Sequence, residues 1–138
     1  MGSTRRSATQ AALTVRRPMA HVLETVTQGY SARHDITRAL DEADAILAAH
    51  PEVDTLLWNA AAHEGHDPGN AAIALKWIAE KRVFRRIAMV TTQPSMVALV
   101  NVGRVMLPDV EVEVFARRED ALPWITRSPG RARRTSAP

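Results

Sequence analysis

RRIAMVTTQP, at residues 85–94, is the stretch that best predicts the fold class. Two arginines precede four consecutive apolar residues, and such a run is typical of a central strand that is covered on both faces. The Thr-Thr-Gln-Pro that follows predicts a turn into a helix. A buried strand that leads directly into a helix is the repeating unit of an α/β fold with parallel strands.

The segments on either side of this stretch alternate between strand and helix patterns. Apolar residues recur every three or four positions from Ile36 to Leu47, which predicts a helix over residues 34–49 with Asp35 as its N-cap. Strict alternation over residues 110–114 predicts a strand near a sheet edge. The other expected elements are strands over 11–16, 19–28, 53–60 and 87–90, and helices over 71–83, 95–107 and 118–126.

These elements follow one another in the order β-β-α-β-α-β-α-β-α. The first two strands, separated by Arg17-Pro18, should form an antiparallel hairpin that ends at residues 29–31. The last three strands alternate with helices and should be parallel, with right-handed crossovers. We therefore predict an α/β domain over residues 11–126, with a mixed, mostly parallel five-stranded sheet and helices packed on it.

The composition excludes several classes of protein. The chain has 138 residues, of which 46% are hydrophobic and 24% charged, as in one globular domain. It contains no cysteine, which excludes disulfides, thiol catalysis and cysteine-bound zinc. No apolar run is long enough to span a membrane, and none follows Arg5 and Arg6 as in a secretory signal. A bacterial cytoplasmic location is the simplest expectation.

The charge of the chain is concentrated at its ends. The net charge is +3, yet residues 7–126 contain 12 basic and 15 acidic residues. The ends, residues 1–10 and 127–138, combine arginine with Ser, Pro, Gly and Thr, which predicts two disordered basic tails. Such tails would contact nucleic acid or an anionic surface weakly and in a salt-sensitive way, although a solubilising role is the simpler interpretation.

Four segments together carry a family signature. They are Arg86–Val90, Met96, Val110–Phe115 and the sequence EDALPWI at residues 119–125, which is the most specific of them. In this order they resemble the SpoIIAA-like branch of the STAS-like families, small bacterial relatives of anti-sigma-factor antagonists. The resemblance implies a STAS-like fold, and this architecture is similar to that of the CRAL-TRIO lipid carriers.

The resemblance also implies a mode of action. Classical members bind a regulatory partner and are switched by phosphorylation of a serine in an Asp-Ser-Ser-Gly-type turn, between the third strand and the next helix. The corresponding turn here is DPGN at residues 67–70, and residues 59–90 contain no Ser or Thr. Because phosphorylation of this kind requires a hydroxyl, we expect partner binding without the classical phosphoserine switch.

HEGHDPGN, at residues 63–70, contains the residue types of a metal or anion site. It is predicted to lie in a loop over residues 61–70, at the carboxyl end of a parallel strand, where open α/β sheets bind ligands. A metal-dependent enzyme would use His63, Glu64, His66 and Asp67, but the His-x-x-His spacing is not the helical zinc motif. We expect instead a polar loop without metal that caps the next helix through Asp67 or Asn70.

A second candidate group surrounds the start of the helix over 95–107. Thr92 and Ser95 lie where free N–H groups could bind an anion, and Arg117 follows the last strand. Helix capping by Thr92 or Ser95 is the simpler interpretation. Because no nucleophile–base pair is evident, we predict a protein that is not an enzyme and has no cofactor. The loop and anion candidates are His63, His66, Asp67, Asn70, Thr92, Ser95 and Arg117.

The helix over 95–107 has more apolar residues than one core-facing stripe requires. The stripe itself consists of Met96, Leu99, Val100, Gly103, Met106 and Leu107. The additional valines predict a second contact, with a second copy, a protein partner or an apolar ligand beneath a movable helix. Neighbouring elements that flank the helix are the alternative explanation. The candidate partner-binding residues are Val97, Asn101, Val102, Arg104 and Val105.

Together these observations predict a non-enzymatic regulatory or scaffolding module. It would bind a protein partner, or a second copy of itself, through the helix over 95–107 and the loop over 61–70. The alternative is a carrier of a small apolar ligand, which predicts an apolar cavity of about 300 Å³ or more. Trp58, Trp77 and Trp124 are expected to be core anchors.

Overall fold

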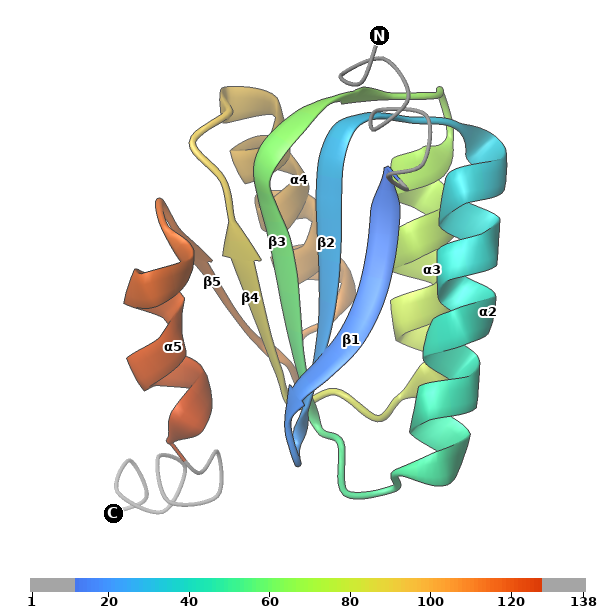
Figure 1. Cartoon of the computed structure of the whole chain (residues 1–138). Coiled ribbons are helices and arrows are strands. Elements are labelled where there is room, and N and C mark those ends of the chain that lie inside the picture. Colours follow the sequence, from blue (N-terminus) through green and yellow to red (C-terminus); the bar gives the residue numbers. More distant parts are fainter. Residues whose placement is uncertain (1–11, 128–138) are drawn as a thin grey trace, which may run out of the picture.

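The five strands of the sheet lie side by side in the order in which they occur along the chain (Figure 1). This computed structural model describes residues 12–127. The elements are β1 (Leu13–Met19), β2 (Val22–Ser31), α2 (Arg33–Ala49), β3 (Thr55–His66), α3 (Asn70–Lys81), β4 (Arg86–Val90), α4 (Pro94–Met106), β5 (Glu111–Phe115) and α5 (Arg118–Thr126). β1 and β2 are antiparallel, and the other neighbouring strands are parallel. The predicted α/β class and mixed sheet are therefore confirmed.

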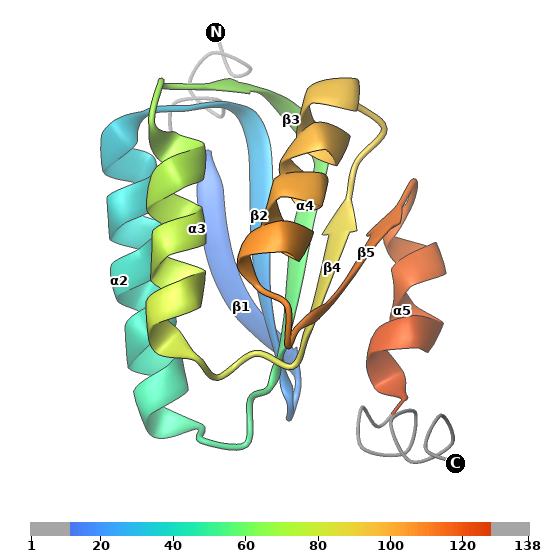
Figure 2. The same cartoon turned by 180° about the vertical axis from the view of Figure 1, so that it is seen from behind.

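The helices are divided unequally between the two faces of the sheet. Figures 1 and 2 show α2, α3 and α4 over one face and α5 alone over the other. Successive side chains of a strand point to opposite faces. Leu56 and Trp58 accordingly belong to the larger core cluster beneath three helices, whereas Leu57 belongs to a smaller cluster that includes Ala121 and Ile125 of α5.

β4 is the buried strand that the apolar run predicted, and all five of its residues are buried. β5 pairs only with β4 and is an edge strand, as its alternating pattern indicated. None of the helices in residues 12–127 is both long and apolar enough to cross a membrane. The predicted basic tails lie outside the described residues, except for Arg127.

Three strand boundaries differ from the sequence prediction. β1 continues through Arg17-Pro18 to Met19, because β1 is an edge strand whose pairing is irregular there, and an edge tolerates proline. β2 continues through Gly29, whose φ of +64° accompanies register shifts in its pairing with β3. β3 continues to His66, so most of the predicted loop over 61–70 is strand. In β2 and β3 the glycines accompany irregular pairing between the two strands and do not end them.

The predicted helix caps were also wrong. The N-cap of α2 is Ala32, and Asp35 lies three residues into the helix, where its carboxylate accepts the Ala32 N–H at 2.7 Å. Gly69, with a φ of +90°, precedes α3 in place of Asp67 or Asn70. Gln93 is the N-cap of α4, so neither Thr92 nor Ser95 caps it. In α2, the carboxylate of Asp35 in the first turn still satisfies an N-terminal donor and interacts favourably with the positive end of the helix dipole.

Two arginines attach α5 to the sheet. Arg118, its first residue, donates to the carboxylate of Glu24 on β2 at 2.8 and 3.0 Å, and Arg16 adds a third bond at 2.8 Å. Arg86 of β4, itself fully buried, donates to the carbonyl oxygens of Trp124 and, at 3.0 Å, Arg127. Its guanidinium also lies 4.7 Å from the centroid of the Trp124 ring. Both ends of this short helix are therefore held by charged hydrogen bonds.

Candidate functional site

Three of the five exposed large hydrophobic side chains among the described residues lie on α4. Val102, Val105 and Met106 are 48%, 81% and 52% exposed, and their spacing of three and four places them on one side of the helix. Val97 is half-buried. Met106 and Leu107 were both predicted in the core stripe; Leu107 is buried, but Met106, where the helix ends, is exposed.

Arg104 and Asn101 lie beside this apolar surface but already have partners. Arg104 donates twice to the carbonyl oxygen of Val112 on β5, at 3.1 and 2.9 Å, and once to Asn101 Oδ1 at 3.0 Å. Its guanidinium also lies 3.6 Å from the carboxylate of Glu113. Both residues are exposed, yet the contacts of Arg104 connect α4 to the edge strand.

A groove lies where α3 and α4 end, and Met106 is the residue of α4 that lines it. Its volume is about 550 Å³, and its lining includes Met106, Arg82, Arg85 and Asp109. Both arginines are exposed and, within residues 12–127, neither side chain has an ion-pair partner. The exposed apolar side of α4 therefore ends, at Met106, beside two arginines.

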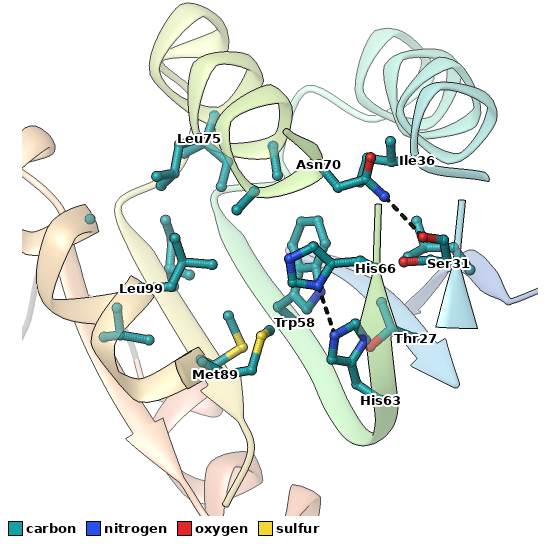
Figure 3. Close-up of a pocket in the computed structure, with 18 of the residues that line it drawn as sticks. Thr27, Ser31, Ile36, Trp58, His63, His66, Asn70, Leu75, Met89 and Leu99 are labelled. Atoms are coloured by element: carbon teal, nitrogen blue, oxygen red, sulfur yellow. Dashed lines mark hydrogen bonds between the residues drawn. The ribbon is translucent and has the colours of Figure 1, made fainter. Parts of the chain in front are cut away.

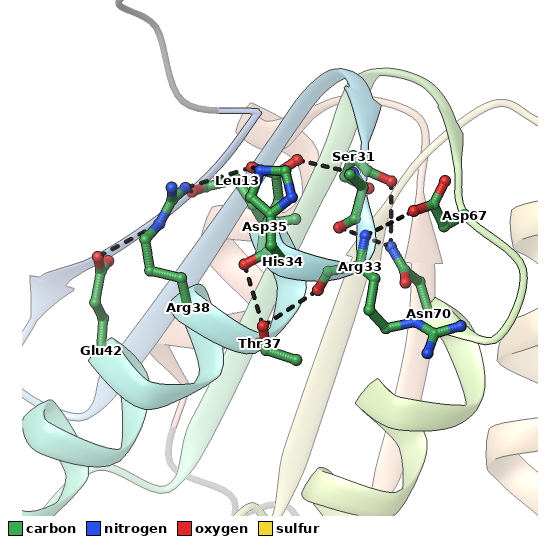
Figure 4. A network of polar contacts seen from close by, with 11 residues as sticks. Leu13, Ser31, Arg33, His34, Asp35, Thr37, Arg38, Glu42, Asp67 and Asn70 are labelled. Carbon is green, nitrogen blue, oxygen red and sulfur yellow. Dashed lines mark hydrogen bonds and ion pairs between the residues drawn. The ribbon is translucent and has the colours of Figure 1, made fainter.

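The segment 61–70 does not form a metal site. Successive residues of a strand point to opposite faces, so His63 is buried while Glu64 is exposed. Asp67 accepts hydrogen bonds from the Tyr30 hydroxyl and from the Arg33 N–H, and these bonds hold its pKa below the ordinary value. The bond from Arg33, seen in Figure 4, fixes Asp67 to the start of α2. Within residues 12–127, no three His, Asp or Glu side chains are grouped as metal ligands would be.

The predicted anion-binding residues differ in their exposure and in their contacts. Thr92 and Ser95 are exposed and cap no helix, and the hydroxyl of Thr91 accepts the Gln93 N–H at 3.1 Å. Arg117 precedes α5 and donates to Asp120 at 3.3 Å; this hydrogen bond raises the pKa of Arg117 above its ordinary value. His63 and Asn70 are each only 5% exposed, so neither is presented to solvent.

His63 and His66 form a stacked pair beneath α3 (Figure 3). Their ring centroids are 5.1 Å apart, and His63 Nε2 lies 3.0 Å from His66 Nδ1. Gln93 donates its side-chain N–H to the His63 carbonyl oxygen, which joins the start of α4 to β3. Burial, and then the charge of His66, lower the pKa of His63. Both effects favour the neutral form of His63.

An apolar pocket lies between the sheet and helices α3 and α4, next to this histidine pair. Figure 3 shows Leu75, Leu99 and Met89 on its apolar side and His63 and His66 on its polar side. Its volume is about 80 Å³, well below the size expected for a carrier of a larger apolar ligand.

Lowering the pH should destabilise the fold through His63. Because the folded-state pKa of His63 lies below its ordinary value of 6.5, the unfolded chain takes up the proton first. The free energy of unfolding should therefore fall as the pH drops below about 6.5, and level off below the folded-state pKa. Urea unfolding at several pH values would measure this. The His63→Gln variant should show a shallower dependence, and an unchanged one would contradict the prediction.

Gly103→Ala should stabilise the protein by about 0.5–1 kcal/mol, because glycine within a helix costs conformational entropy. A Cβ at this position would meet Leu75 Cδ2 at 3.7 Å, an ordinary contact. The measurement is the midpoint of urea unfolding. A lower midpoint would indicate that α3 and α4 pack more tightly than the structure describes.

Comparison with known proteins identifies related folds. A family model described as SpoIIAA-like matches residues 19–126. An uncharacterized Shewanella loihica protein with a SpoIIAA-like fold has a TM-score of 0.63 and 21% identity, over 82% of this chain and 91% of that one. The unphosphorylated anti-sigma factor antagonist SpoIIAA gives 0.56 and 14%, over 83% and 97%. Phosphorylated SpoIIAA, a Bacillus cell fate determinant, gives 0.62 and 16%, over 83% and 99%. No curated protein matches the sequence.

Proposed function

The chain belongs to the SpoIIAA-like family, and from this premise we propose that it is a non-enzymatic regulatory or scaffolding module that binds a protein partner through α4. The observation that carries the proposal is the exposed apolar side formed by Val102, Val105 and Met106. Single exposed apolar residues are ordinary, but three on one side of a helix favour an interaction surface. SpoIIAA, which has a similar fold, is an anti-sigma factor antagonist.

The charges around this surface favour a partner segment that combines apolar and acidic residues. Apolar side chains of the partner would pack on Val102 and Val105, while its carboxylates would pair with Arg82 and Arg85 at the groove. A second copy is a poorer match, since Asp109 is the only acidic residue lining the groove. We therefore favour a different protein over a homodimer.

The segment 61–70 would contribute through its exposed residues alone. Glu64 and Pro68 are exposed, whereas His63 and Asn70 are buried. Residues 59–90 contain no Ser or Thr, so the proposed module works without a phosphoserine in the turn at 67–70. Asp67 cannot take the place of a free phosphate there, because its two oxygens are bound to Tyr30 and Arg33.

The Val102→Glu, Val105→Glu double variant should lower partner affinity at least 100-fold, because it places two carboxylates in an apolar contact. Tagged wild-type protein would be purified gently from its host, and its complex identified by native mass spectrometry. Affinity for the purified partner would then be measured for each variant. Hydrogen exchange on the complex should show protection of α4.

The matched control is Ala45→Glu, Ala48→Glu, which adds the same two charges to exposed positions of α2. This control should bind as the wild type does. Unchanged binding by the folded α4 variant, or protection confined to other elements, would refute the proposal. Replacing Arg82 and Arg85 by Glu should weaken binding and reduce its salt dependence, as expected for an acidic partner.

A further inference from the structure

We propose that Arg82 determines which partner is bound, by pairing with a single carboxylate that enters the groove where α3 and α4 end. This inference rests on the proposed function, because it concerns a partner segment that continues from α4 into the groove. Arg82 directly follows α3, and its backbone is left-handed, with a φ of +57° and a ψ of +28°. Within residues 12–127 it is the only residue other than glycine that has a positive φ.

The left-handed conformation of Arg82 is unfavourable for an arginine. The Cβ of an L-residue crowds the following carbonyl oxygen there, so glycine is the usual residue where a helix ends in this way. The Arg82 N–H donates to the Ile78 carbonyl oxygen at 3.4 Å, which closes the last turn of α3. The end of the helix therefore requires the backbone conformation but not the arginine side chain. Strained residues of this kind are concentrated at functional sites.

The guanidinium of Arg82 is available to a ligand, together with that of Arg85. Both residues are exposed and line the groove, and within residues 12–127 neither side chain forms an ion pair. Seven other arginines in the same part of the chain do form ion pairs. Guanidinium groups pair well with carboxylates, often through two parallel hydrogen bonds. Two unpaired guanidinium groups on one groove therefore favour an acidic ligand.

The backbone of Arg85 is fixed before any partner arrives. Its N–H donates to the Asp54 carbonyl oxygen at 2.7 Å, and its carbonyl oxygen accepts the Glu111 N–H at 3.0 Å. Arg82 is held in turn by its bond to Ile78. Because both arginines project from ordered backbone, binding loses less conformational freedom there than it would on a loose loop.

Asp109 limits the charge of the matching ligand. It is exposed and is the only acidic residue in the lining, beside Arg82 and Arg85, so the lining carries two positive charges and one negative charge. The resulting net charge of +1 matches one carboxylate. A phosphate ester carries nearly two negative charges at neutral pH, and the second charge would be repelled by Asp109. The groove therefore favours a glutamate or aspartate side chain over a phosphorylated one.

The floor of the groove requires apolar groups next to that carboxylate. Ile78, Phe84 and Leu107 line it and are 7%, 6% and 9% exposed. Met106 lines the groove and also belongs to the exposed apolar side of α4. One partner segment can therefore cover that side with apolar side chains and place an acidic residue in the groove.

Arg82→Gly should have opposite effects on stability and on binding. Glycine relieves the strain of the left-handed conformation, so the midpoint of urea unfolding should rise. Removal of the guanidinium should at the same time weaken binding of an acidic ligand. The matched control is Arg85→Gly, because Arg85 has no positive φ. Glycine at that position should lower the midpoint, since it only adds freedom to the unfolded chain.

Binding would be measured with the blocked peptide acetyl-Leu-Glu-Leu-amide and ¹⁵N-labelled protein. We expect saturable shifts of the Nε–H signals of Arg82 and Arg85, with a Kd on the order of millimolar because the peptide is small. Acetyl-Leu-Gln-Leu-amide should bind roughly tenfold more weakly, and Arg82→Gly should weaken binding of the glutamate peptide by a similar factor, as expected for the loss of a charged hydrogen bond.

Two further variants test the role of charge. Lys76→Gln removes one positive charge from an exposed position of α3 outside the groove, and it should leave binding of the glutamate peptide unchanged. Asp109→Asn should improve binding of acetyl-Leu-phosphoserine-Leu-amide more than binding of the glutamate peptide, because it removes the repulsion of the second phosphate charge.

Several results would overturn the inference. They are the absence of saturable shifts, equal binding of the glutamine peptide, tighter binding of the phosphoserine peptide to the wild type, and full affinity or a lower unfolding midpoint in Arg82→Gly. The proposed function fails separately, through the α4 variant. If Val102→Glu, Val105→Glu abolishes binding of the purified partner but Arg82→Gly does not affect it, the surface on α4 is correct and the role of Arg82 is wrong.

Discussion

The Arg118→Met variant should be less stable than the wild type by about 3–5 kcal/mol, the usual cost of breaking a buried ion pair. Glu24 is completely buried, and Arg118 supplies two of the hydrogen bonds to its carboxylate. Without them, Glu24 keeps only Arg16, whose side chain is 55% exposed, and a 3.3 Å bond from Asn59. Denaturant unfolding followed by circular dichroism would measure the loss.

A double variant separates the cost of an unpaired charge from the cost of lost packing. Glu24→Leu combined with Arg118→Met removes both charges, and its stability should return to within about 1 kcal/mol of the wild type. A loss below 1 kcal/mol in the single variant would show that water reaches Glu24.

The contacts of Glu24 with Arg118 and Arg16 also make a pH-dependent contribution to the free energy of unfolding. Burial raises the pKa of Glu24, but Arg118 and Arg16 together lower it below its ordinary value of 4.5. The folded state therefore releases this proton more readily than the unfolded chain. The resulting stability is complete above pH 4.5 and is lost as the pH falls through the folded-state pKa. Arg118→Met should lose most of this contribution.

Leu57→Ala and Leu56→Ala should each cost about 2–5 kcal/mol, because both side chains are completely buried. The two neighbours point to opposite faces of the sheet, so their local effects should differ. Leu57 belongs to the cluster that holds α5, and its loss should accelerate amide exchange within residues 118–126. Leu56→Ala should not accelerate amide exchange in α5 more than elsewhere, because Leu56 packs in the other cluster.

Hydrogen exchange by mass spectrometry distinguishes these cases. Peptides from α5 should exchange faster than all others in Leu57→Ala, beyond the global loss of stability. Equal acceleration of α5 in both variants would mean that the two faces of the sheet open as one unit.

The order and type of the elements could be predicted because hydrophobic periodicity records burial directly. The continuous run in β4 and the repeat of α2 each reflect which faces are covered. The ends of β2 and β3 could not be predicted in this way. Glycine and polar residues at 29–31 and 63–66 suggest turns, yet pairing between the two strands continues through bulges to Ser31 and His66. Pairing of this kind depends on the neighbouring strand, not on the local sequence.

For the same reason, the sequence predicted the exposed residues of α4 but not the burial of the other candidate residues. Exposure of Val102 and Val105 followed from the geometry of a single helix. Burial of His63 and Asn70 depends on how α3 packs over β3, and no local pattern records that. The position of Glu24 between Val22 and Val26 gave a signal of strand alternation, but its partner Arg118 lies 94 positions away along the chain.

The bonds from Arg104 to β5 have a consequence for the open edge of the sheet. An edge strand is a template for other chains, and unpaired backbone groups there promote aggregation through strand addition. Arg104 occupies the carbonyl oxygen of Val112 with two donors, and Glu111 and Glu113 place negative charges along the same short strand. An incoming strand would have to displace the guanidinium and approach these carboxylates. These contacts therefore oppose strand addition at the open edge of the sheet beside the exposed apolar side of α4.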